Sequence, residues 1–239
     1  FRDGKSELTP RLQDPIAQSS DGERWLLINA SPDIHQQIAR APELLPRRSR
    51  HSPIAAIILT NGDLDHVLGL FSLRESQRLV VYTTEAIWRP LAERCVFVRT
   101  LQRTEDQLQF RPLTLRAATD IVDADGASIG LTVTSVPGPA KLALHLEGLP
   151  APTDADNMAV SIREQSTDQH VAYATTSASI GSFLDPLAGA DCLFFDGTFW
   201  SEDELPRLGM STRLARDMAH VPISGDNGSL AQLATFAAR

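Results

Sequence analysis

One stretch of ten residues constrains the fold of this chain more than any other: residues 57–66, which read Ile-Ile-Leu-Thr-Asn-Gly-Asp-Leu-Asp-His. Its apolar beginning is typical of the end of a buried strand, and the Asn-Gly pair is typical of a tight turn. The apolar residues that follow predict a helix over residues 64–75. A carboxylate, Asp65, and an imidazole, His66, are therefore placed at the end of a strand, where α/β folds have their functional sites.

Asp65 and His66 can be interpreted in two ways. A carboxylate and a neutral imidazole are ligands that suit zinc or iron, so the pair could belong to a metal site. Alternatively, Asp63 or Asp65 could simply accept backbone N–H bonds in the first turn of the helix. The motif alone leaves both interpretations open, and residues elsewhere in the chain have to decide between them.

Asp196 and His220 are two further candidates. Asp196 ends an apolar strand predicted over residues 191–195, so it could line a cleft or could close the strand with a turn. His220 precedes Val-Pro, and a segment before proline is poorly suited to a helix interior. We predict a catalytic role for His220 as a general acid or base, or an outer hydrogen-bonding role, with a structural histidine as the alternative. Four histidines are assigned to structure or solvent, namely His35, His51, His145 and His170.

The order of the predicted elements indicates the fold class. Strands and helices alternate over the first hundred residues, and the middle of the chain is rich in strands. This order favours a mixed α/β (α+β) protein, an αββα sandwich in which two mixed sheets face each other and helices lie outside. No linker divides the chain, so residues 1–239 are predicted to form a single domain. Strands are predicted at 25–29, 55–60, 79–82, 113–115, 131–136, 158–163, 171–174 and 191–195, and helices at 33–40, 64–75, 84–91, 182–188 and 229–236.

Charge and composition exclude several classes of partner. Residues 1–120 contain 16 basic and 15 acidic side chains, whereas residues 121–239 contain 6 and 15. An acidic half disfavours a broad phosphate-binding surface, so nucleic acid is not an expected partner. No apolar run approaches the ~20 residues that span a bilayer, so we expect no membrane association and a cytoplasmic protein. Cys95 and Cys192 lack metal-binding spacing and are predicted to be reduced thiols in the core.

Several segments together resemble the pyrroloquinoline quinone (PQQ) biosynthesis protein B family, a branch of the metallo-β-lactamase superfamily. The resemblance spreads over most of the chain and is weakest across residues 100–157. It implies the metallo-β-lactamase form of the αββα sandwich, with a metal site at the strand ends. The matching segments are 29–34 with 37–38, 59–66 with 69–70 and 73–75, 196–198 with Asp203, and 216–220.

The chain departs from the superfamily signature at two positions. That signature is His-x-His-x-Asp-His, and Asn61 and Asp63 occupy its first two histidine positions. Asparagine is a poor zinc ligand in place of imidazole, so a two-zinc site is not expected. The resemblance implies that Asp65, His66 and Asp196 hold one metal ion together with a histidine from a C-terminal segment of the family. Two histidines and a carboxylate with open positions are the arrangement of non-haem Fe(II) oxygenases.

The resemblance favours an enzyme, a mononuclear iron hydroxylase that adds oxygen to the tyrosine ring of a Glu–Tyr precursor of PQQ. Asp65 and His66 would hold Fe(II), Asp196 would ligate or orient it, and His220 would carry protons. Two alternatives stay open: a carrier that binds PQQ or its precursor and assists its transport, and a zinc-dependent hydrolase. Expected partners are the tyrosine-derived peptide or PQQ and other proteins of the PQQ pathway, and a homodimer stays open.

The family has two segments that are not found among these 239 residues. One is an N-terminal cysteine-rich segment that looks like a structural zinc site. The other is a C-terminal His-Ile-Asn-Asn segment, which would supply the further metal-binding histidine. We therefore expect that residues are missing from this sequence at both termini, and that structural zinc would belong to the N-terminal segment.

Overall fold

The computed structural model describes residues 16–49, 51–74, 78–139, 141, 143, 145–146, 148, 151–177, 179–181 and 186–234. Its strands form two five-stranded sheets. The first has the order β1-β2-β3-β4-β5 and consists of Ile16–Gln18, Trp25–Ile28, Ile54–Ile58, Leu79–Thr83 and Leu108–Pro112. The second has the order β10-β9-β8-β7-β6 and consists, from β6 to β10, of Ala118–Val122, Ser128–Pro137, Met158–Glu164, His170–Ala174 and Cys192–Phe195.

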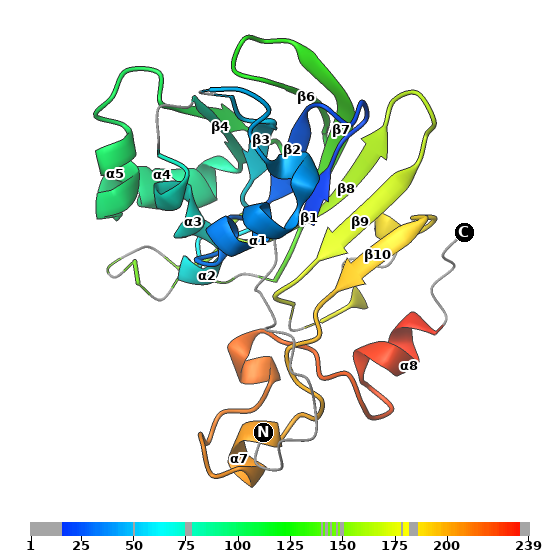
Figure 1. Cartoon of the computed structure of the whole chain (residues 1–239). Coiled ribbons are helices and arrows are strands. Elements are labelled where there is room, and N and C mark those ends of the chain that lie inside the picture. The colour runs from blue at the N-terminus through cyan, green and yellow to red at the C-terminus, as the bar shows by residue number, and fades with distance from the viewer. Residues whose placement is uncertain are drawn as a thin grey trace, which may run out of the picture.

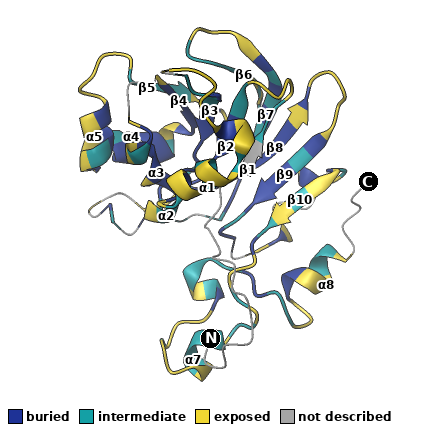
Figure 2. Cartoon of the chain, in the orientation of Figure 1, coloured by how far each residue is buried: buried dark blue, intermediate teal, exposed yellow. Residues whose placement is uncertain are grey.

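Both sheets are mixed. In the first, β2 to β5 are parallel and β1 is antiparallel to β2. In the second, β6 to β9 are antiparallel and β10 is parallel to β9. The sheets share one apolar core, in which Ile58 and Val81 of the first sheet and Val133 and Ile162 of the second are fully buried (Figures 1 and 2). The predicted αββα sandwich with two mixed sheets is confirmed.

The helices are short. Helix α4 begins as predicted, because the Thr84 side chain accepts a hydrogen bond from the Ile87 N–H at 3.2 Å. Its Trp88 stacks on Phe110 of β5 with ring centroids 4.8 Å apart, which packs α4 against the first sheet. Within the described ranges, no helix combines the length and apolar character that crossing a bilayer requires. The helices are α1 (Ile34–Arg40), η1 (Pro42–Leu44), α2 (Leu64–Val67), α3 (Gly69–Ser72), α4 (Glu85–Arg94), α5 (Val96–Leu101), α7 (Glu204–Arg207), η2 (Arg216–Met218) and α8 (Ser229–Leu233).

The helix predicted over residues 64–75 is divided into α2 and α3 at Gly69. A Cβ atom at Gly69 would lie only 2.3 Å from the backbone oxygen of Ser31. Instead, the Gly69 N–H donates to the Ala30 carbonyl at 2.8 Å. Glycine therefore lets this segment approach the loop after β2 closely, and the approach fixes the residues of α2 just before it.

Two other local predictions are wrong. Residues 113–115 are not a strand, because the chain turns there between β5 of the first sheet and β6 of the second, with Arg116 at φ 62°. Strand β10 is at the edge of the second sheet and is only half covered, so the thiol predicted to lie in the core at Cys192 is exposed, whereas Cys95 is buried. The predicted helix at 182–188 lies largely outside the described residues.

Candidate metal centre

His66 lies in α2, directly after β3 and its turn, and is 8% exposed. Its backbone is held on both sides. The His66 N–H donates to the Asp63 carbonyl at 2.9 Å, and the His66 carbonyl accepts from the Ala30 N–H at 2.7 Å. Asp63 is the residue before α2 but makes no side-chain capping bond, so capping does not explain its carboxylate. The backbone from which the His66 side chain extends is therefore fixed by main-chain contacts.

Two polar residues at neighbouring strand ends orient the His66 ring. Asn29 follows β2 in the left-handed region at φ 63°, and its Oδ1 accepts from the Thr60 N–H at 2.9 Å and from the Thr60 hydroxyl at 3.0 Å. The Thr60 Oγ1 lies 3.5 Å from Nδ1 of His66. Because the hydroxyl proton is given to Asn29, the oxygen presents a lone pair to the ring. This arrangement favours hydrogen on Nδ1 and leaves Nε2 as the nitrogen for a metal.

Asp196 directly follows β10, and its side chain is 2% exposed. One carboxylate oxygen, Oδ1, accepts from the Thr198 N–H at 3.1 Å and from the Thr198 hydroxyl at 2.8 Å. The other, Oδ2, lies 2.7 Å from Nδ1 of His220. The predicted strand-closing turn is therefore present, and Asp196 is at the same time the partner of His220. The carboxylate has about four lone-pair sites, so these three contacts leave a site at which it could bind a metal ion.

The direction of the His220 ring is fixed by its surroundings. The preceding residue, Ala219, is in the left-handed region at φ 64°, which is rare for residues other than glycine and asparagine. The His220 N–H donates to the Ala215 carbonyl at 3.1 Å, and the Phe199 ring meets the imidazole edge-on with centroids 5.5 Å apart. With Nδ1–H directed to Asp196, Nε2 carries the lone pair, so His220 can accept a proton there.

A polar bridge joins the strand ends of the two sheets. Asn61, after β3, forms an isolated β-bridge with Asn157, before β8. The Asn157 side-chain amide donates to the Thr176 carbonyl, after β9, at 2.7 Å. The Asp196 N–H in turn donates to the Ala174 carbonyl at the end of β9, at 3.1 Å. The strand ends that lead to His66 and to Asp196 therefore belong to one edge of the sandwich.

The structure brings Asp196 and His220 together. Among the residues that the structure describes, no three His, Cys, Asp or Glu side chains are grouped as a complete metal-binding set. The convergence of Asp65, His66 and Asp196 on one ion therefore stays a prediction. Its support is the shared edge described above.

Asn61 and Asp63, which replace the first two histidines of the superfamily signature, have other partners. The Asn61 Oδ1 accepts from the Asp63 N–H at 3.0 Å. The Asp63 Oδ2 lies 2.6 Å from the Nζ of Lys141. An amide and an ion-paired carboxylate do not reproduce a site of imidazole ligands.

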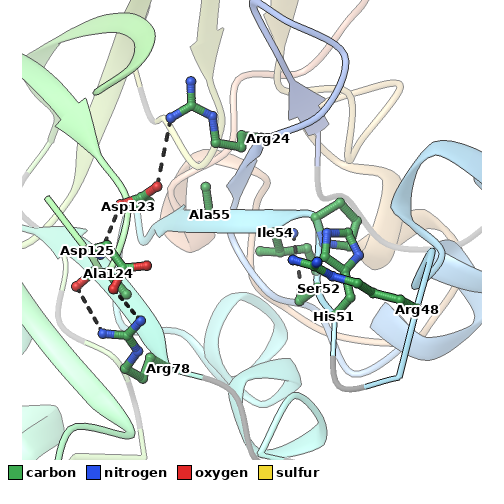
Figure 3. Close-up of a pocket in the computed structure, with 11 residues that line it drawn as sticks. Arg24, Arg48, His51, Ser52, Ile54, Ala55, Arg78, Asp123, Ala124 and Asp125 are labelled. Atoms are coloured by element: carbon green, nitrogen blue, oxygen red, sulfur yellow. Dashed lines mark hydrogen bonds and ion pairs between the residues drawn. The ribbon is translucent and has the colours of Figure 1, made fainter. Parts of the chain in front are cut away.

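A separate cleft of about 390 Å³ lies at the beginning of β3, away from the strand ends. Figure 3 shows its arginines and acidic residues. Arg24 lies 3.8 Å from Asp123, and Arg78 lies 2.5 Å from Asp125. These two ion pairs connect residues directly before β2 and β4 to the turn between β6 and β7. The candidate metal residues do not line this cleft.

Sequence reasoning gave no site role to Asn29, Thr60 or Lys141. Asn29 and Thr60 are each the last residue of a predicted strand, and this position was a usable signal, because strand ends meet at one edge. Lys141 lies in a Pro- and Gly-rich region where no regular pattern is present. The only signal is its rarity, since the chain has two lysines, Lys5 and Lys141.

Comparison with known proteins supports the family and the fold. The family model described as beta-lactamase superfamily domain matches residues 24–239. The chain is 39% identical over 234 residues to coenzyme PQQ synthesis protein B of Methylobacterium nodulans, covering 97% of this chain and 75% of the relative. It is 38% identical over 231 residues to the protein of the same name from Rhodopseudomonas palustris, covering 94% and 74%.

Solved structures give the same result. The Zn²⁺-bound PqqB of Methylobacterium extorquens matches with a TM-score of 0.85 and 38% identity, covering 98% of this chain and 76% of that chain. A diphosphatase of the PhnP family matches with a TM-score of 0.55 and 23% identity, covering 80% and 62%, and shows likeness of fold alone. The metallo-β-lactamase fold expected from the sequence is confirmed.

Proposed function

The chain belongs to the coenzyme PQQ synthesis protein B family, and from this premise we propose that it acts in the biosynthesis of the cofactor PQQ. The finer proposal is a mononuclear iron hydroxylase that acts on a tyrosine-derived Glu–Tyr precursor. One observation carries it: Asn61 and the ion-paired Asp63 replace the two histidines of the first metal position of the superfamily, whereas Asp65 and His66 of the same signature are present.

The proposed donor set is chemically suited to one ion. Asp65, His66 and Asp196 would supply one imidazole and two carboxylates, which suit Fe(II) or zinc. His66 and Asp196 both have hydrogen-bonding neighbours that orient them, as metal ligands usually do. A bound Fe(II) ion would supply the redox chemistry with oxygen that side chains lack. The PqqB of M. extorquens was solved with Zn²⁺, which supports metal binding in this family without deciding between the two metals.

His220, assisted by Asp196, would accept the hydroxyl proton of the tyrosine ring of the substrate. The hydroxyl of a tyrosine ring loses its proton more easily when a base lies within hydrogen-bonding reach. Nε2 of His220 is such a base, because Nδ1 is directed to Asp196 at 2.7 Å. The buried carboxylate would stabilise the imidazolium that forms, as in other His–Asp pairs. In this proposal, His220 accepts the proton of the substrate hydroxyl, and Asp196 holds the His220 ring in the orientation that this requires.

The two alternatives are weaker on specific grounds. A zinc hydrolase of the usual superfamily type uses two ions as a clamp on its substrate, and Asn61 and Asp63 cannot hold the first of them. A carrier has no need of an oriented proton acceptor, which the Asp196–His220 pair supplies. The departures from the signature remain the main argument for a carrier.

Metal content and turnover of the full-length protein test the proposal together. The protein is purified without oxygen, stripped of metal, and reconstituted with Fe(II), with Zn(II) or with no metal. Each form is given a Glu–Tyr peptide, oxygen and a chemical reductant, because one oxygen atom enters the ring and two electrons are needed to reduce the other to water. Oxygen consumption and product mass are then measured. We expect oxygen-dependent hydroxylation by the Fe(II) form only. Cleavage of the peptide by the zinc form would establish a hydrolase, and tight binding of PQQ without turnover by any form would establish a carrier.

A further inference from the structure

The first metal position of the fold, defined here by Asn61 and Asp63, is filled by an ion pair. The Nζ of Lys141 lies 2.6 Å from Oδ2 of Asp63, and the two side chains are 21% and 20% exposed. Partial burial makes such a pair stronger than one in open water, because the local dielectric constant is lower. A positive charge is thus already present where the superfamily places a cation.

The neighbouring donor, Asn61, is also committed to contacts within the protein. It is 2% exposed, its Oδ1 accepts from the Asp63 N–H at 3.0 Å, and its Nδ2 faces Oδ1 of Asn157 at 3.5 Å. A metal ion at this position would have to displace these bonds. The hydrogen bonds of Asn61 and the ion pair of Asp63 therefore use the polar groups of this turn in contacts within the protein.

The segment that carries Lys141 is held against this turn by apolar contacts. Ala143 and Leu146 belong to the main core. A Cβ atom added to Gly62 would lie 3.4 Å from the Cβ of Ala143 and 3.9 Å from Cδ1 of Leu146, so both side chains rest on the turn. The position of Lys141 is therefore set by the packing of Ala143 and Leu146 near Gly62 as well as by its own charge.

His145, in the same segment, does not compete with Lys141 as a cation. Its Nε2 is buried and has no hydrogen-bond partner among the described residues. Burial lowers the pKa of this imidazole, although the charge of Asp63 opposes the shift. The imidazole is therefore neutral at neutral pH, and the ammonium of Lys141 is the cation that faces Asp63.

Lysine suits this position better than arginine. The sequence has 22 basic residues, and apart from Lys5 and Lys141 they are all arginines. An ammonium is a compact point charge, whereas a guanidinium is a wide planar fork. A single carboxylate oxygen, Oδ2 of Asp63, faces Lys141, and a point charge matches one oxygen without the second acceptor that the guanidinium fork would use.

We propose that the Lys141 ammonium takes the place of the first metal ion of the fold, neutralises Asp63 and excludes a second divalent cation. The centre then accepts one ion only. This inference rests on the one-metal site of the proposed function and concerns the number of metal ions only, so zinc binding can test it without any assay of the reaction.

Zinc binding by three variants tests this proposal. Asn61→His supplies an imidazole but keeps Lys141; Asn61→His with Lys141→Gln supplies the same imidazole and removes the charge. Asn61→His with Arg163→Gln is the matched control, because it removes a charge from the exposed Arg163–Asp168 pair instead. Full-length proteins, stripped of metal and checked for folding by circular dichroism, are titrated with Zn²⁺ alone. We expect one additional zinc ion per chain only in the variant that lacks Lys141. In the other two variants, any binding at this position should be at least tenfold weaker.

The proposal is overturned if Asn61→His alone gains the additional ion, or if removal of Lys141 gains none. If the variants with Asn61→His do not fold, a double-mutant cycle of Lys141 and Asp63, with Asn61 unchanged, tests the proposal instead. Lys141→Gln should tighten Zn²⁺ binding at the remaining centre, Asp63→Asn should weaken it, and the double variant should return to within about twofold of the wild type. Single variants that both leave the affinity unchanged would also overturn the proposal.

Discussion

Oδ2 of Asp196 lies 2.7 Å from Nδ1 of His220, although 24 residues separate them along the chain. The intervening segment contains α7 and η2 and extends beyond the two sheets before it returns (Figure 1). The contact therefore joins the two ends of this segment next to the end of β10. Because the two side chains contact each other directly, a change to either residue also removes a hydrogen-bond partner of the other.

Replacement of His220 should separate proton transfer from metal binding. We expect His220→Gln to lower kcat by about 10²–10⁴-fold, the usual contribution of a general acid or base. Its metal content should stay at the wild-type level. Asp196→Asn should lose metal as well, since it removes a ligand charge. Metal analysis beside steady-state kinetics distinguishes the two, and loss of metal from His220→Gln would assign that residue to the ligand set.

The hydroxyl of Thr60 should matter for metal affinity through the orientation of His66. We expect Thr60→Val, which keeps the shape and removes the hydroxyl, to weaken metal binding by about 10–100-fold, as for other residues that orient a ligand. Thr60→Ser keeps the hydroxyl and should stay close to the wild type. Competition with a fluorescent chelator measures both affinities. Equal metal affinities for the two variants would mean that the 3.5 Å contact between Thr60 and His66 does not contribute to metal binding.

Removal of the His66 imidazole should abolish turnover while the fold is kept. His66→Ala leaves the backbone bonds to Asp63 and Ala30 in place, and these bonds anchor α2. A loss of about 1 kcal/mol in unfolding free energy is expected, which is typical of single substitutions. Thermal melting followed by circular dichroism is compared with oxygen consumption on the Glu–Tyr peptide. Full activity in the variant would eliminate the hydroxylase, and loss of the fold would make His66 structural.

The sequence predicted the parts of the site that depend on local pattern. The strand before Asn61, the position of His66 at the strand end and the strand before Asp196 are confirmed, because apolar runs followed by turn residues report burial and its end. The two mixed sheets followed from the order of such runs and from the family resemblance. These features need no knowledge of contacts between distant residues.

Other features could not be predicted because distant residues decide them. The division between α2 and α3 at Gly69 depends on the approach of Ser31, from another loop. The partner of Asp63 is Lys141, which lies 78 residues away in a segment without periodicity. The exposure of Cys192 follows from the place of β10 at the sheet edge, which a run of apolar residues does not reveal.

Glu164 should make stability depend on pH in the acidic range. It lies at the end of β8, and its carboxylate accepts hydrogen bonds from Ser20, Thr167 and Ser166. These bonds, with that of Ser20 first, hold the pKa of the carboxyl well below its ordinary value. An unfolded chain then binds the proton more readily than the folded one. The stabilisation is fully present above the ordinary glutamate pKa of about 4.3 and is lost as the pH falls through the lowered folded pKa.

The Tm of the wild type and of Glu164→Gln, measured from pH 7 down to pH 2.5, checks this dependence. Glutamine cannot accept all of these bonds, so the variant should have the lower Tm at pH 7. The gap should narrow below about pH 4, where protonation begins to remove the wild-type advantage. Glu105→Gln, at an exposed glutamate, is the matched control and should follow the wild-type curve. A gap between Glu164→Gln and the wild type that stays constant down to pH 2.5 would mean that the variant acts through packing, and that the carboxylate charge of Glu164 contributes nothing to folding.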